Sequence, residues 1–106
     1  MKALLTAEVT DEFVANLESL GYSSEIAGWG VTRSALTEDE LVTRLRDVSL
    51  LVCELEEVTE RVLEQCPDLK IIASARANPT NVDTTAAEAR GIWVLNTPGR
   101  NAESVA

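Results

Sequence analysis

Apolar and polar positions alternate along the chain in blocks that predict strands and helices in turn. Short, almost continuous apolar runs are typical of buried strands, whereas apolar residues three or four positions apart between a capping residue and a stop signal are typical of helices. We expect strands at Lys2–Thr6, Tyr22–Ile26, Ser49–Cys53, Lys70–Ala75 and Ile92–Leu95. We expect helices that begin at Thr10 or Asp11, at Thr37, at Thr59 and at Asp83. This strict alternation predicts an α/β fold, a three-layer sandwich in which helices cover both faces of a parallel sheet.

Two of the expected helices are supported by local sequence patterns. Thr37 and Glu40 have the spacing of a capping box, in which each side chain receives a hydrogen bond from the other residue's backbone amide. In the first helix, Phe13, Leu17 and Leu20 recur at helical spacing, so they are expected to face the core.

Three other segments qualify the pattern. Tyr22–Ile26 is more polar than the other strands, which is typical of a sheet edge. The run Gly28-Trp29-Gly30 interrupts the alternation and predicts a loop that continues through Ala35. Trp93 lies in an apolar strand, so core packing is its expected role.

The last third of the chain reads as one strand, helix and strand unit with two unusual loops. Close succession of these elements predicts parallel, adjacent strands joined by a right-handed crossover. The loops Arg76–Asn81 and Asn96–Asn101 then follow the carboxyl ends of the strands, the edge at which such sheets bind ligands.

Three motifs in this region carry a family resemblance. RANPTNVD at 76–83, AAEARGI at 86–92 and NTPGRNAESVA at 96–106 resemble the D-isomer-specific 2-hydroxyacid dehydrogenases, the phosphoglycerate dehydrogenase-like superfamily. The resemblance implies a flavodoxin-like substrate-binding domain over residues 1–100, with the five strands in the order 2-1-3-4-5. It also implies that residues 101–106 begin a helix leading to a Rossmann NAD-binding domain that lies outside this chain.

Composition narrows the class of protein. The 106 residues, 45% apolar and 25% charged, suit a single domain. Nine basic and 18 acidic residues leave a formal charge of −9, which argues against nucleic acids and anionic membranes as partners. With no apolar run long enough to span a bilayer and no secretory signal, we expect a cytoplasmic location. Cys53 and Cys66 lack metal-ligand spacing and are expected to be free thiols.

The sequence carries no catalytic residue that we can identify. It contains no histidine, no glycine-rich dinucleotide or triphosphate loop and no nucleophile motif. No cofactor is therefore expected to bind this chain tightly, and the resemblance implies that NAD in a full-length enzyme is held mainly by the other domain.

The resemblance does imply substrate-binding positions. The backbone amides of Ala77 and Asn78 match those that hold the substrate carboxylate, although the family often has a Gly-Gly or Val-Gly pair there. Asn78 tolerates a left-handed backbone better than most residues. Arg76 can pair with a substrate carboxylate or phosphate, or else form a salt bridge with Glu54 or Glu8.

The resemblance also implies roles for three later positions. Asn101 matches an asparagine that hydrogen-bonds substrate in some family members, and it is also a natural helix N-cap. Ser104 and Val105 match positions that approach the nicotinamide ring.

Taken together, these features predict the N-terminal substrate-binding domain of an NAD-dependent D-2-hydroxyacid dehydrogenase, acting on a small 2-hydroxy or 2-keto acid and inactive alone. We expect a homodimer or self-association through the apolar face that the rest of the enzyme would cover. One alternative is a free-standing flavodoxin-like binding or signalling module, although Glu8 stands alone after the first strand and Glu54 replaces the Asp of a phosphoacceptor. Another is an excised domain made for folding studies.

Overall fold

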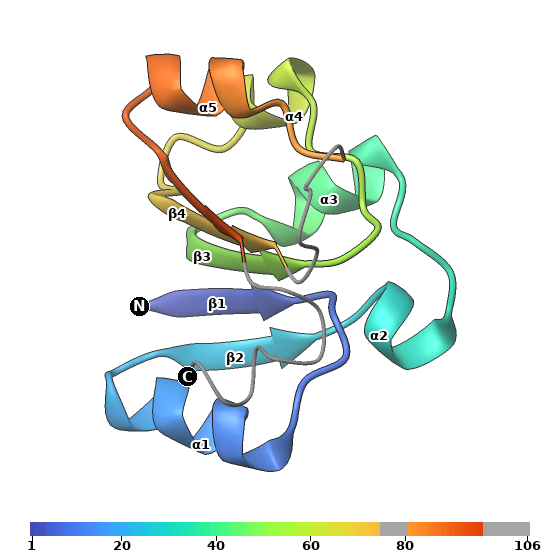
Figure 1. Ribbon diagram of the computed structural model, residues 1–106, viewed down its shortest axis with the longest axis vertical. Coiled ribbons are helices and arrows are strands. Elements are labelled where there is room, and N and C mark those ends of the chain that lie inside the picture. The colour runs from blue at the N-terminus through green and yellow to red at the C-terminus, as the bar shows by residue number, and fades with distance from the viewer. Residues whose placement is uncertain (75–80, 97–106) are drawn as a thin grey trace.

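A five-stranded parallel sheet organises the molecule (Figure 1). The computed structural model describes residues 1–74 and 81–96. Its strands are β1 (Lys2–Leu5), β2 (Ser23–Ile26), β3 (Val48–Cys53), β4 (Ile71–Ser74) and β5 (Trp93–Asn96). Their order across the sheet is β2-β1-β3-β4-β5, and all four neighbouring pairs are parallel. The strand order implied by the resemblance is confirmed, as is the prediction that the polar second strand lies at an edge.

Helices cover the sheet unequally on its two faces. They are α1 (Asp11–Ser19), α2 (Trp29–Thr32), α3 (Glu38–Arg44), α4 (Glu60–Glu64) and α5 (Thr84–Ala89). Figure 1 shows α1 on one side of the sheet and α3, α4 and α5 on the other. The predicted three-layer α/β sandwich is therefore confirmed. In residues 1–74 and 81–96, no helix is long and apolar enough to cross a membrane.

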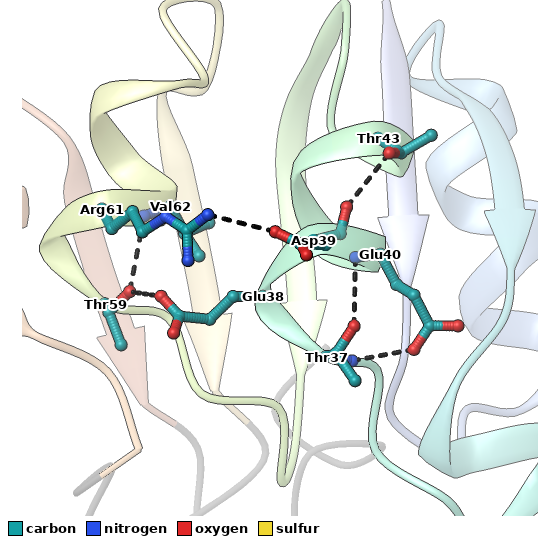
Figure 2. A network of polar contacts seen from close by, with 8 residues as sticks. All are labelled: Thr37, Glu38, Asp39, Glu40, Thr43, Thr59, Arg61 and Val62. Carbon is teal, nitrogen blue, oxygen red and sulfur yellow. Dashed lines mark hydrogen bonds and ion pairs between the residues drawn. The ribbon is translucent and has the colours of Figure 1, made fainter.

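Side-chain caps begin four of these helices at the predicted residues. Thr10, Thr37, Thr59 and Asp83 each accept a hydrogen bond from the backbone amide three positions later. At α3 the full capping box forms, because Glu40 also accepts from the Thr37 amide at 2.9 Å (Figure 2). These caps satisfy amides that have no partner inside the helix.

The same network joins α3 to α4. Figure 2 shows the Thr59 hydroxyl donating to the Glu38 carboxylate, at 2.5 Å, and Arg61 reaching Asp39, at 3.2 Å. Side chains in the first turn of each helix thus fix the two helices side by side. Both Arg61 and Asp39 are largely exposed, so their ion pair adds little stability.

Alternation along the strands divides the core into two clusters. Leu4, Leu51 and Ile72 point to the face that α3, α4 and α5 cover. Leu5, Leu50 and Val52 point to the face that α1 covers, where Leu17 and Phe13 pack on them. Each central strand is therefore buried on both faces, which explains why β3 reads as a continuous apolar run.

The prediction that Trp93 lies in the core is wrong. In the sheet register, one row runs Ala3, Leu50, Ile71, Trp93, and the exposed fraction rises along it from 1% at Ala3 and 7% at Leu50 to 72% at Trp93. The next row of side chains on the same face of the sheet ends at Leu95, which is 49% exposed. The reason is coverage: among the described residues, α1 packs on the β1 and β3 part of this face, Ile71 and Ala73 of β4 are partly buried, and Trp93 and Leu95 of β5 are exposed.

Two further predictions need correction. Leu20 is 68% exposed because α1 ends at Ser19, and the backbone of Leu20 already departs from the helix. The loop predicted from Gly28 to Ala35 instead contains the helical turn α2. Gly28 adopts a left-handed φ of 81°, and its carbonyl accepts from the amides of Val31 and Thr32, at 3.0 and 2.9 Å, which closes that turn.

Candidate functional site: the carboxyl rim of the sheet

All six residues predicted to bind substrate or cofactor lie outside the described residues. They are Arg76, Ala77, Asn78, Asn101, Ser104 and Val105. Ser74 and Asn81 bound the segment that contains the first three, and both lie at the carboxyl edge of the sheet. The structure therefore describes the frame around the predicted site, which we call the carboxyl rim: the connections that follow β1, β2, β3 and β4.

The centre of the carboxyl rim lies between the ends of β1 and β3. This is the switch point of the sheet, because the chain adds β2 on one side of β1 and β3 to β5 on the other. The Thr6 amide donates to the Val52 carbonyl at 2.8 Å, which extends the pairing of these strands beyond Leu5. The Gly30 amide donates to the Thr6 carbonyl at 2.7 Å. A Cβ at Gly30 would lie 2.4 Å from the Ala7 carbonyl oxygen, so only glycine lets α2 approach the strand end this closely. The switch point is thus tightly packed by backbone.

A fully buried carboxylate stands beside this switch point. Glu56, in the connection after β3, is 0% exposed, and its Oε2 accepts from the Leu36 amide at 3.1 Å. A Cβ at Gly28 would lie 2.6 Å from the same oxygen. Sequence reasoning missed Glu56 because nothing in the segment Glu54-Leu-Glu-Glu57 distinguishes one acid from the next.

Asn81 joins the carboxyl rim from the other side. Its Nδ2 donates to the Glu56 carbonyl at 2.8 Å and lies 4.0 Å from the Cys53 sulfur. Its own carbonyl accepts from the Val58 amide at 2.8 Å, and the Val58 carbonyl accepts from Asp83 at 2.9 Å. The Asp83 side chain accepts from the Ala86 amide as the cap of α5, at 3.0 Å, whereas the Asn81 side chain is itself a donor.

Charge on the carboxyl rim is partly paired. Glu8, after β1, forms an ion pair with Arg33, and both side chains are more than half exposed. The predicted salt bridge from Arg76 to Glu54 or Glu8 involves a residue outside the described ranges and stays a prediction. Arg33 holds a left-handed φ of 63°, which is uncommon outside glycine and asparagine.

The two cysteines are buried and free, as predicted. Burial raises the pKa of Cys53 to about 12, and the nearby Glu56 charge acts in the same direction. Burial alone raises the pKa of Cys66 to about 11. Both therefore stay protonated at neutral pH and are poor nucleophiles. Within the described residues, no three potential metal ligands come together.

Comparison with known proteins identifies the family. The model of the "D-isomer specific 2-hydroxyacid dehydrogenase, catalytic domain" matches residues 3–106. The chain is 40% identical over 108 residues to the 2-hydroxyacid dehydrogenase YoaD of Bacillus subtilis, matching 100% of this chain and 31% of that protein. It is 33% identical over 107 residues to the D-3-phosphoglycerate dehydrogenase of Methanocaldococcus jannaschii, again 100% of this chain but 19% of that protein.

A solved structure agrees in fold. A D-isomer specific 2-hydroxyacid dehydrogenase from a Polaromonas species, described as NAD-binding, superimposes with a TM-score of 0.78 at 28% identity, over 92% of this chain and 30% of that one. The chain thus spans about a third or less of the length of each of these three proteins. This match does not favour the alternative of a free-standing binding or signalling module.

Proposed function

Because the chain belongs to the family of D-isomer-specific 2-hydroxyacid dehydrogenases and matches its catalytic domain, we propose that it is the substrate-binding lobe of an NAD-dependent oxidoreductase. The reaction we propose is hydride exchange between NAD(H) and C2 of a small 2-hydroxy or 2-keto acid. The observation that carries the proposal is the sheet order β2-β1-β3-β4-β5 together with the family match, because ligands of such sheets lie at the carboxyl rim.

In this proposal the chain grips the acid, and a second domain performs the chemistry. The amides of Ala77 and Asn78 hold the substrate carboxylate, since fixed backbone donors bind an anion without adding a charge of their own. Arg76 and Asn101 contact the rest of the substrate, and Ser104 and Val105 approach the nicotinamide. The chain contains no histidine, so this proposal assigns the general acid and base groups to the proposed second domain.

A domain boundary near residue 100 follows from the same reasoning. Residues 1–100 form the lobe, and 101–106 begin the crossing to the NAD-binding domain. This division assigns NAD mainly to the other domain, as proposed from sequence.

Two titrations of the 106-residue chain test the proposal. We expect NMR titration of the labelled chain with glyoxylate or D-glycerate to shift amide resonances at the carboxyl rim. We expect isothermal titration with NAD to give no micromolar affinity. Tight NAD binding by the chain alone, or a carboxyl rim that responds to neither acid, would contradict the proposal.

We also propose that the chain self-associates as a homodimer through the apolar strip at the β5 edge of the sheet. The support is the apolar strip formed by Ile71, Ala73, Trp93 and Leu95, the last two 72% and 49% exposed, on a sheet type that normally has both faces covered. Sedimentation should show association that increases with concentration, and a monomer at high concentration would refute it.

A cytoplasmic location is proposed as well, because two free cysteines suit a reducing compartment.

A further inference from the structure

Glu56, on the carboxyl rim, accepts hydrogen bonds from two segments that are distant in sequence. The carboxylate of Glu56 accepts from the Leu36 amide, 20 residues earlier, at 3.1 Å. Its backbone carbonyl accepts from the Asn81 side chain, 25 residues later, at 2.8 Å. The segments before α3 and before α5 are therefore both fastened to the connection after β3.

The surroundings show that this fastening leaves little freedom. Glu56 and Thr6 are both 0% exposed. Gly28 packs against them so closely that there is no room for a Cβ at this position. On the far side, Asn81 is also held through its backbone, in an isolated parallel bridge between Val58 and Val82. The fastened segments thus have backbone as well as side-chain contacts.

A charged residue is an expensive choice for such a position. A buried carboxylate needs hydrogen bonds to offset its lost hydration, and an apolar residue of similar size would often stabilise a core more. The arrangement favours defined geometry over stability. Geometry matters most at a binding site, where a small misplacement of fixed donors weakens the grip on a ligand.

We propose that Glu56 and Asn81 are positioning residues of the substrate site. They fasten the described segments before α3 and before α5 to the connection after β3, and the proposed carboxylate-binding residues precede Asn81 in the sequence. Asn81 follows Asn78 by only three positions in the sequence. This inference rests on the proposed function, because it assigns Glu56 and Asn81 to the binding of that same small acid.

The charge of Glu56 allows its proposed role in positioning the substrate site to be distinguished from simple structural support. The carboxylate is needed as an acceptor for Leu36, but its negative charge is unfavourable near an anionic ligand. Glu56→Gln keeps a carbonyl acceptor and nearly the same volume without the charge. Glu56→Ala removes the acceptor, and Asn81→Ala removes the donor to the Glu56 carbonyl.

The experiment measures glyoxylate binding to the 106-residue chain by NMR, with amide hydrogen exchange on the same samples. Ile92→Val is the control, because it removes a methyl group from the core at the opposite, amino edge of the sheet, where Ile92 is 6% exposed. We expect Glu56→Ala and Asn81→Ala to raise the dissociation constant about tenfold, since misaligned donors bind less well. Glu56→Gln should bind at least as tightly as the parent, and Ile92→Val should bind equally.

Hydrogen exchange reports the fastening independently of the ligand. Glu56→Ala should lose protection at the Leu36 amide, and Asn81→Ala should lose it at the Val58 and Asp83 amides. If the parent binds glyoxylate and both alanine variants bind it equally well, or if Ile92→Val weakens binding as much as they do, the inference is overturned and the proposed function stands. If the parent binds neither glyoxylate nor D-glycerate, the proposed function fails and this role fails with it.

Discussion

Gly28→Ala probes the packing on which the carboxyl rim depends. Its φ of 81° lies in the left-handed region, where an alanine costs about 1–2 kcal/mol. The new Cβ would also meet Glu56 Oε2 at 2.6 Å and Leu36 Cγ at 3.0 Å, so the carboxylate has to move. That movement breaks its bond from the Leu36 amide, and leaving buried polar groups unpaired costs about 1–3 kcal/mol. The two terms together predict a loss of about 2–5 kcal/mol.

Gly91→Ala separates the two terms. Gly91 has a similar φ of 74°, but a Cβ there meets no atom within 4 Å. Its variant therefore carries only the backbone cost, and the difference between the two variants is the cost of displacing Glu56. Urea denaturation followed by circular dichroism measures both losses. If Gly28→Ala unfolds at the same urea concentration as Gly91→Ala, Glu56 is not held against Gly28 and the reasoning is refuted.

Three further predictions follow from other contacts. Gly30→Ala, which would ordinarily strengthen a helix by about 1 kcal/mol, should instead destabilise the protein in the same urea assay, because its Cβ would lie 2.4 Å from the Ala7 carbonyl oxygen; a gain in stability would contradict this. Hydrogen bonding, chiefly from the Thr37 backbone amide, lowers the pKa of Glu40 from its ordinary value of 4.5, so the carboxylate stabilises the fold above that pH and ceases to do so as the pH falls through its folded pKa. The stability difference between the parent and Glu40→Gln should therefore shrink between pH 7 and pH 3, and a constant difference would refute the linkage. Trp93→Glu should abolish concentration-dependent sedimentation, whereas Leu20→Glu, at an equally exposed position on α1, should not; equal effects would exclude a specific interface.

Local chemistry explains why much of the fold could be predicted. A cap needs only a side chain and an amide three residues away. The starts of four helices can therefore be predicted from one turn of sequence, at Thr10, Thr37, Thr59 and Asp83. Strand order has no such local cause, because alternation alone fits several sheets. The order was predicted from the resemblance.

The failures at Trp93 and Leu20 have a different cause. Apolar character marks a residue that gains from burial, but burial requires another element to lie over it. Trp93 alternates onto the face where α1 covers only part of the sheet, and Leu20 falls just past the end of α1. Neither fact is contained in the periodicity of the segment itself, so both residues look like core residues in the sequence.

The carboxyl rim was the least predictable region because its bonds join distant segments. The partners of Glu56 lie 20 residues before it and 25 after it, and they meet only once β1, β3 and β4 are paired. The precision of the proposed substrate site is therefore a property of the whole sheet. A core substitution that shifts β1 against β3 should loosen the grip on the ligand even though it touches no residue of the site.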